Sequence, residues 1–243
     1  MTNSTFSANS ADFGGVGGGI ANAGTLTVTN STFSANSADF GGVGGGIANA
    51  GTLTVTNSTF SANSALGGNG GGILNAGTLT LKNTIIANST GGGDCSNFGT
   101  VTTNSINNLI EGSAACGLTN GVNGNIIGSD PNLGALTGSP AYFPLLPGSP
   151  AIDAGDNTTC AAAPVNNQSQ NGVTRPQDGD DPDSAATCDI GSVEAIFPNF
   201  NGSQEQQRRR DDCARPFLHL DGDGLEQRLS RSDLCSRRDS LAR

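Results

Sequence analysis

A near-perfect internal repeat dominates the first third of the chain. Residues 2–28 read TNSTFSANSADFGGVGGGIANAGTLTV, residues 29–55 are identical to them, and residues 56–81 repeat the pattern one residue shorter. Repeats of about 20–50 residues form solenoids and arrays, because each unit buries its apolar face only by stacking on its neighbours. The chain is therefore expected to be a stack of similar turns.

Each copy contains three short segments that favour β-strands, which in the first copy are residues 18–22, 25–29 and 31–35. Residues 25–29, TLTVT, alternate apolar and polar side chains with the period of a strand. Glycine density and β-branched residues argue against helices. Equivalent strands of successive copies would pair in parallel, and the crossover rule gives such a path a right hand. We predict an all-β protein, a right-handed parallel β-helix (solenoid) over residues 1–130.

Stacking at about 4.8 Å per turn places equivalent residues directly above one another. Apolar columns are expected inside the solenoid, formed by Phe6, Phe33 and Phe60, by Ile20, Ile47 and Ile73, and by Leu26, Leu53 and Leu79. Stacked amides are expected at the corners, formed by Asn9, Asn36 and Asn63 and by Asn22, Asn49 and Asn75. A corner position also explains the repeated asparagines that begin N-x-S/T sequons, Asn3, Asn30 and Asn57.

The repeat decays after residue 81, and the composition then changes twice. Residues 83–130 still alternate in places, which indicates further, degenerate turns. Residues 131–197 are rich in proline-containing turns and are expected to form an irregular capping module over the open last turn. Residues 198–243 are rich in arginine and poor in glycine, and we interpret them as a disordered or frameshifted tail.

The charge of the body of the chain narrows the partners that it can bind. Residues 1–197 contain 13 acidic side chains and two basic ones, Lys82 and Arg175. Nothing in them could neutralise the phosphates of a nucleic acid, and anionic lipid surfaces would repel them. No run of 18 apolar residues occurs, so we expect no membrane insertion by this segment.

Six cysteines lie far apart and form no CxxC pair, while the single histidine, His219, lies in the tail. This pattern does not suit a zinc site and fits disulfides formed in an oxidising compartment. Six cysteines allow 15 connectivities. Proximity in the sequence favours the pairs Cys95–Cys116 and Cys160–Cys188. Because no leader peptide precedes the first repeat, we expect the chain to be a fragment whose export signal lies outside it.

Two resemblances support display at a bacterial surface. GGGI at residues 17–20 and FSAN at residues 6–9 resemble the GGA-hydrophobic and FxxN motifs of polymorphic outer membrane protein repeats, although Gly19, Gly46 and Gly72 replace the alanine of that motif. Residues 83–195 resemble the choice-of-anchor Q domain of bacterial surface proteins through the segments NTIIAN, GDC, NLI, DPNLGAL, LLPGSPAIDAG, RPQDG and CDIGSVEA. The resemblances imply a β-helix that is exported and displayed, with no established chemistry.

Few residues suit an active site or a metal site. Asp12 and Asp39 would stack one turn apart, but they lie in a glycine-rich corner loop that is shortened in the third copy, so we interpret them as solvated loop residues. A run of aspartates is a weak candidate for Ca²⁺; its members are Asp178, Asp180, Asp181 and Asp183. The segment Asp221 to Glu226 matches only part of a calcium loop. We expect no catalytic residues and no cofactor, with Ca²⁺ as the alternative.

We therefore predict a non-enzymatic, exported adhesin-type protein, located outside the cell or on its surface. Its partner is expected to be a protein or polysaccharide of a host or neighbouring cell. One alternative is a fragment of a carbohydrate-active β-helix enzyme, such as a pectate lyase or polygalacturonase, that lacks its catalytic turns. A second alternative is an ice-binding solenoid, because Thr25, Thr27 and Thr29 are expected to face outward on a flat strand and regular threonine arrays can order water.

Overall fold

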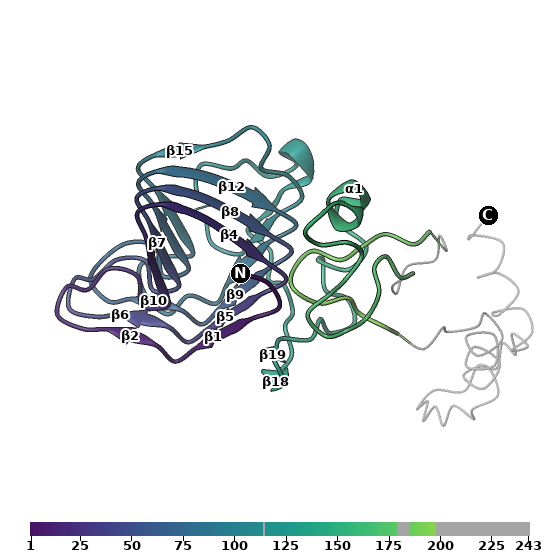
Figure 1. Ribbon diagram of the computed structural model, residues 1–243, viewed down its shortest axis with the longest axis horizontal. Coiled ribbons are helices and arrows are strands. Elements are labelled where there is room, and N and C mark those ends of the chain that lie inside the picture. Colours follow the sequence, from purple (N-terminus) through teal and green to yellow (C-terminus); the bar gives the residue numbers. More distant parts are fainter. Residues whose placement is uncertain (114, 179–184, 198–243) are drawn as a thin grey trace, which may run out of the picture. The chain divides into compact units, whose positions relative to one another are not determined.

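The computed structural model describes residues 1–113, 115–178 and 185–197, and in them the chain forms a parallel β-solenoid (Figure 1). The first turn contains β1 (Thr5–Ser7), β2 (Ser10–Ala11), β3 (Ile20–Asn22) and β4 (Thr25–Thr29). The second contains β5 (Thr32–Ser34), β6 (Ser37–Ala38), β7 (Ile47–Asn49) and β8 (Thr52–Thr56). The third contains β9 (Thr59–Ser61), β10 (Ser64–Ala65), β11 (Ile73–Asn75) and β12 (Thr78–Lys82).

The later turns are less regular, as the decay of the repeat predicts. They contain β13 (Ile85–Ala87), β14 (Cys95–Asn97), β15 (Thr100–Val101), β16 (Leu109–Ile110) and β17 (Ile126–Ile127). A short 3-10 helix (Val122–Gly124) precedes β17. Among residues 131–178 and 185–197, the structure has the hairpin β18 (Thr137–Gly138) and β19 (Ala141–Tyr142) and one short helix, α1 (Asn157–Ala161). Residues 198–243, including the predicted tail, lie outside the described residues.

The strands of successive turns pair in parallel in four sheets, which run in the orders β1-β5-β9-β13-β16-β17, β2-β6-β10, β3-β7-β11-β14 and β4-β8-β12-β15. The prediction of three strands per turn is therefore wrong for the first three turns, each of which has four. The additional strand is the dipeptide Ser-Ala, as at Ser10–Ala11. Two residues are too short for their alternation to be recognised in the sequence.

Inward side chains of the repeats form continuous apolar columns. Phe6 pairs in register with Phe33, and Phe33 with Phe60. Their rings stack nearly parallel, with centroids 4.7 Å and 4.4 Å apart. Phe33 and Phe60 are fully buried, whereas Phe6, in the first turn, is half-buried. The isoleucine and leucine columns are fully buried in the second and third turns, at Ile47, Ile73, Leu53 and Leu79. Their first-turn members, Ile20 and Leu26, are partly buried and pack against this core. Each buried side chain of this size contributes about 2–3 kcal/mol of transfer free energy.

The corner asparagines form hydrogen-bonded ladders. Asn9 Nδ2 donates to Asn36 Oδ1 at 2.8 Å, and Asn36 Nδ2 donates to Asn63 Oδ1 at 2.9 Å. The second ladder has spacings of 2.7 Å and runs through Asn22, Asn49, Asn75 and Asn97. Because each amide is both donor and acceptor, a buried corner stays satisfied however many turns are stacked.

Gly19, Gly46 and Gly72 occupy three equivalent positions where the backbone leaves no room for a side chain. A Cβ on Gly19 would lie 2.6 Å from the carbonyl oxygen of Gly46, and one on Gly72 would lie 2.6 Å from the carbonyl oxygen of Asp94. A Cβ on Gly46 would lie still closer to the carbonyl oxygen of Gly72. The turns pass too close together at this position for any side chain.

Residues 131–197, which we call the lateral module, pack against the side of the solenoid. They contact the outward side of the sheet β1-β5-β9-β13-β16-β17 along several turns. In the first turn, the Thr5 hydroxyl donates to the Ala141 carbonyl at 2.6 Å. Near the last turns, the Asn107 side-chain amide donates to the Ala154 carbonyl at 3.0 Å. These contacts are lateral, along the side of the stack of turns. The contacts run along the stack of turns, so the module stabilises several turns at once.

The outward column of this sheet changes from threonine in the first three turns to isoleucine and leucine in the later turns, and both kinds of residue contact the module. Its register is Thr5, Thr32, Thr59, Ile85, Leu109 and Ile126. The hydroxyl of Thr32 donates to Gln170 Oε1 at 2.6 Å, and the Ser192 N–H donates to Thr59 Oγ1 at 3.0 Å. The later residues form a second apolar core with residues of the module, Leu145, Ala151, Ile152, Ile190 and Val193. Both faces of this sheet are thus covered, as is usual for parallel sheets.

No helix within the described residues is long and apolar enough to cross a membrane.

Candidate functional site

A buried ionic cluster of Arg175, Asp189 and Glu194 lies in the lateral module. Arg175 is fully buried, and its Nη1 lies 3.5 Å from Glu194 Oε2. The guanidinium also donates to the main-chain carbonyls of Asp189 and Gly191, both at 2.8 Å. The ion pair and these two bonds offset part of the cost of burying the charge, although Arg175 Nε has no hydrogen-bond partner among the described residues.

The two carboxylates of the cluster bind main-chain N–H groups from several loops. Glu194 accepts from Gln177 at 2.7 Å and from Asp189 at 3.0 Å, and Asp189 accepts from Asp153 at 2.9 Å and from Ala195 at 2.6 Å. The cluster therefore ties together the segments around residues 153, 177 and 195, which contain few regular hydrogen bonds of their own. Its groups act on the fold of the module, since they are buried and bonded to its backbone.

Burial dominates the protonation of the cluster. It raises the pKa of Asp189 to about 7, with the nearby Glu194 adding to the rise, against the N–H bonds from Ala195 and Asp153 and the charge of Arg175. Burial also raises the pKa of Glu194, against the charge of Arg175 and the N–H bonds from Asp189 and Gln177. The pKa of Arg175 is lowered by burial, which the two carboxylates oppose.

Sequence reasoning missed this cluster, although the sequence carried a signal for it. Arg175 is one of only two bases in residues 1–197, and it lies in RPQDG, while Asp189 and Glu194 lie in CDIGSVEA. An isolated arginine in a segment of the chain that is otherwise almost free of bases indicates a specific ionic partner, and the structure contains one.

The asparagine strip, defined as Asn30, Asn57, Asn83 and Asn107, attaches the lateral module to the solenoid. These residues occupy one corner of successive turns with φ between 45° and 49°, a left-handed conformation that asparagine tolerates well. Asn30 Nδ2 donates to the Gln168 carbonyl at 3.0 Å, and Asn83 Oδ1 accepts from the Asp156 N–H at 2.9 Å. Asn30 of the repeat, which begins a sequon, and Asn83, which follows the repeats, thus supply docking points for the module.

The two predicted disulfides, Cys95–Cys116 and Cys160–Cys188, are present. Cys160–Cys188 lies over the asparagine strip, where Asn57 Nδ2 and Asn83 Nδ2 each lie 3.3 Å from Cys160 Sγ. It joins α1 to the segment that contains Asp189, so it supports the docked face of the module. Cys213 and Cys235 lie outside the described residues.

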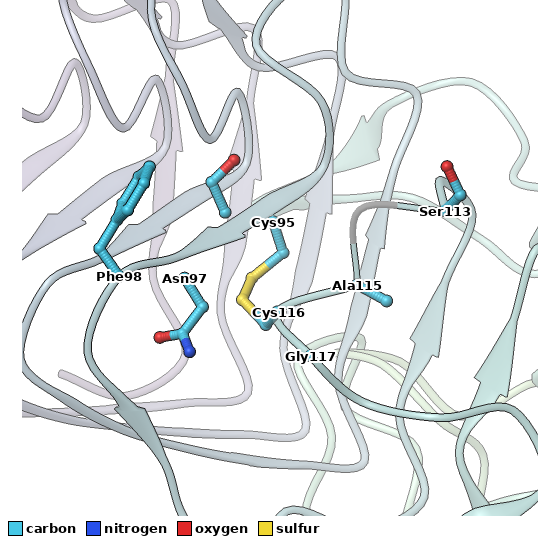
Figure 2. Close-up of a pocket in the computed structure, with 8 residues that line it drawn as sticks. Cys95, Asn97, Phe98, Ser113, Ala115, Cys116 and Gly117 are labelled. Atoms are coloured by element: carbon cyan, nitrogen blue, oxygen red, sulfur yellow. A yellow bond between two sulfur atoms is a disulfide. The ribbon is translucent and has the colours of Figure 1, made fainter.

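Cys95–Cys116 lies at a shallow surface hollow of about 360 Å³, shown in Figure 2. The hollow is lined by residues of β14 and of the segment that follows β16, with Phe98 at one side and Ser113 and Ala115 at the other. The described part of the hollow contains no titratable side chain. Its lining offers hydroxyl, amide and aromatic contacts only.

Asp12 and Asp39 lie at equivalent positions of adjacent turns, directly after the paired residues Ala11 and Ala38, as predicted. Asp12 Oδ1 accepts from Ser10 Oγ at 2.7 Å, and Asp39 Oδ2 accepts from Ser37 Oγ at 3.5 Å, so each carboxylate is also bonded within its own turn. Of the calcium candidates, Asp178 is described, whereas Asp180, Asp181 and Asp183, like the segment from Asp221 to Glu226, lie outside the described residues. Within the described ranges, no group of three or more His, Cys, Asp or Glu side chains is arranged to hold a metal ion.

The threonine face of the sheet β4-β8-β12-β15 is narrower and longer than predicted. Thr29 is fully buried beside the corner where the module docks, so the expectation that it faces solvent is wrong. Two columns remain outward and extend into a fourth turn, with Thr80 Oγ1 and Thr102 Oγ1 2.8 Å apart. Their members are Thr25, Thr52, Thr78 and Thr100, and Thr27, Thr54, Thr80 and Thr102.

Comparison of the chain with known protein families, with curated proteins and with solved structures finds no match. The class of the molecule therefore rests on its own geometry, that of a disulfide-containing parallel β-solenoid with a laterally docked module.

Proposed function

We propose that this chain is part of a non-enzymatic, exported surface protein in which the solenoid is a spacer and a contact surface. The observation that carries the proposal is that the ionisable cluster is buried, whereas the exposed faces consist largely of other side chains. The ionisable cluster with perturbed pKa values is buried and bonded to the backbone of the module, whereas the exposed faces present threonine, asparagine and phenylalanine. Such exposed groups bind a partner through hydrogen bonds and stacking without chemical reaction.

Export is supported by the two disulfides. Both closed pairs suit an oxidising compartment outside the cytoplasm. Routing the full chain through the periplasm of a bacterial host should give a protein in which Cys95, Cys116, Cys160 and Cys188 resist alkylation after denaturation. Mass spectrometry of tryptic peptides would identify the pairs. Free thiols at these four positions in the folded, exported protein would contradict the proposal.

Whether the chain itself cleaves carbohydrate is tested by activity. The full chain is incubated with pectin, polygalacturonate, cellulose and chitin, and newly formed reducing ends and unsaturated products are measured. We expect no product above that of a heat-denatured control. Cleavage of any of these polymers would overturn the proposal of a non-enzymatic role.

A second candidate function is ice binding, favoured by the two threonine columns that run through four turns in register. A flat, regular array of hydroxyl and methyl groups can order water on the spacing of the turns. Thermal hysteresis of the full chain is compared with that of Thr54→Lys, which places a charge in the centre of the face. Hysteresis that the substitution abolishes would favour ice binding over the surface-contact role.

A further inference from the structure

An exposed apolar ridge lies on the corner loops that follow β2 and β6. This phenylalanine ridge consists of Phe13 and Phe40, which are 88% and 77% exposed. Leu66, which is 53% exposed, occupies the position equivalent to Asp39 in the next turn. The rings of Phe13 and Phe40 are stacked with centroids 5.6 Å apart and planes 13° apart. Aromatic side chains of this size are usually buried, so two of them exposed on consecutive turns indicate a binding surface.

The ridge is held in place by hydrogen bonds between turns. The Gly14 N–H donates to the Asp39 carbonyl at 3.0 Å, and the Gly41 N–H donates to the Leu66 carbonyl at 2.8 Å. Phe13 and Phe40 themselves have φ values of +54° and +52°, which a bulky side chain rarely adopts. Strain of this kind persists where the surroundings enforce it, and it clusters at binding sites. The aromatic pair is therefore preorganised rather than carried on a loose loop.

The charge beside the ridge selects the kind of partner. Asp12 and Asp39 directly precede the two phenylalanines, and residues 1–197 contain only two bases. One of these, Arg175, is buried in the module. Acidic polysaccharides, nucleic acids and anionic lipids would be repelled. A neutral partner with hydroxyl donors would instead find carboxylate acceptors next to aromatic faces.

The area of the ridge argues against a second copy of the chain. Two exposed phenylalanines of about 200 Å² each, with Leu66 and the adjacent Val16 half-exposed, present on the order of 500 Å². A stable protein interface buries about 800 Å² on each partner. An extended oligosaccharide needs a smaller contact area, and its sugar rings can bind one after another along the ridge.

We propose that the phenylalanine ridge binds a neutral glycan chain. Sugar rings would pack their C–H faces on Phe13 and Phe40, because aromatic faces carry partial negative charge. Sugar hydroxyls would donate to the carboxylates of Asp12 and Asp39. This inference rests on the proposed surface function and names the chemistry of its partner.

The test measures binding of the full chain to cellohexaose and chitohexaose by calorimetry, with oligogalacturonate as the acidic comparison. The double variant Phe13→Ala/Phe40→Ala should bind the neutral hexamer at least about tenfold more weakly, while Phe13→Trp/Phe40→Trp should retain binding. Phe98→Ala is the matched control, because Phe98 is 70% exposed at the distant Cys95–Cys116 hollow. It should leave affinity unchanged. Because the substituted side chains are exposed, each variant should keep the fold of the wild type, and circular dichroism of each variant checks this.

Three results would overturn the inference. They are an unchanged affinity in the double alanine variant, an equal loss in Phe98→Ala, and no binding of either neutral hexamer by the wild type. Ridge-dependent dimerisation in size-exclusion chromatography would assign the ridge to a second copy instead. In each case, if the disulfides form and no polymer is cleaved, the surface-protein proposal stands. Cleavage of the glycan would refute the proposal of a non-enzymatic role, while the affinity of the double alanine variant would still decide whether the ridge binds the glycan.

Discussion

The solenoid and the lateral module solve the same stability problem by opposite means. In the solenoid, residues 5–127, identical positions stack on one another, so one choice of side chain serves every turn, as in the column of Phe6, Phe33 and Phe60. In the module, residues 131–197, the strands are few, and a disulfide, an ionic cluster and contacts with the solenoid hold irregular loops together. A solenoid distributes its stability over neighbouring turns, whereas the module concentrates it in a few unique groups.

This difference has a consequence for damage by substitution. A change in one turn of the solenoid removes contacts with two neighbours only, while the remaining turns keep theirs. A change in the ionic cluster affects every loop that it holds. The predictions below test this contrast in order of expected effect on the free energy of unfolding.

The largest effect is expected for Phe60→Ala. Phe60 is fully buried between the turns above and below, so its truncation should lower the free energy of unfolding by about 4 kcal/mol through lost burial and a cavity. Phe6→Ala is the matched control, because Phe6 occupies the same column in the first turn and is only half-buried. Urea unfolding followed by circular dichroism measures both. Equal losses would contradict the stacked-column account.

Arg175→Met should cost about 3 kcal/mol at pH 7, because it leaves Asp189 and Glu194 buried without their cation. The loss should shrink at pH 5, where both carboxylates can take up protons. Thermal unfolding at the two pH values tests this. A loss that is the same at both values would show that the packing of the arginine, and not its charge, holds the module.

The wild-type protein should itself become less stable as the pH rises from about 4 to about 7. The pKa of Asp189 is raised to about 7 in the folded state, chiefly by burial, and that of Glu194 is raised as well. The folded state therefore binds more protons than the unfolded state between these pH values. Proton binding to the folded state stabilises the protein fully below the pKa that Asp189 has in the unfolded chain. This stabilisation is lost as the pH rises through the pKa that Asp189 has in the folded state. Asp189→Asn should flatten the dependence, as urea titrations at each pH would reveal. A slope of the opposite sign would refute the assignment.

Replacement of Cys160 and Cys188 by serine should lower the free energy of unfolding by about 2–3 kcal/mol. The disulfide closes a loop with a sequence separation of 28 and lies on the asparagine strip, so its loss should release the module before the solenoid. Limited proteolysis should then cut within residues 131–197 while the repeats stay protected. The serine pair at Cys95 and Cys116 serves as control, and it should leave the module resistant.

The parts of the fold that the sequence predicted are those that the repeat itself encodes. Equivalent positions had to stack, so the phenylalanine column and the asparagine ladders could be assigned residue by residue. Both disulfides followed from proximity, because each pair lies within one local segment. The two-residue strands were missed because alternation needs more residues to be visible.

The docking of the module was missed for a different reason. Thr32 and Thr59 have the pattern of exposed strand residues, yet they are buried against Gln170 and Ser192. A threonine on an outward face is compatible with either solvent or a polar partner, and the partner lies more than 100 residues away in the sequence. Nothing local distinguishes the two cases. The buried arginine was likewise recognisable as isolated, but its partners depend on how loops without regular structure meet.

The smallest effect is expected where the two regions meet, at the asparagine strip. Asn57→Gly removes the amide that lies 3.3 Å from Cys160 Sγ. Glycine also tolerates the left-handed backbone of this position (φ 45°). The substitution therefore tests the docking contact without adding backbone strain. We expect a loss of about 1 kcal/mol, the usual worth of one hydrogen bond. Asn3→Gly is the control, because Asn3 has the same conformation in the first turn and its side chain is exposed. If both substitutions have the same effect in urea unfolding, the strip is a structural corner only. If Asn57→Gly alone destabilises and also speeds proteolysis of residues 131–197, the repeat encodes the docking site of the module as well as the turns of the solenoid.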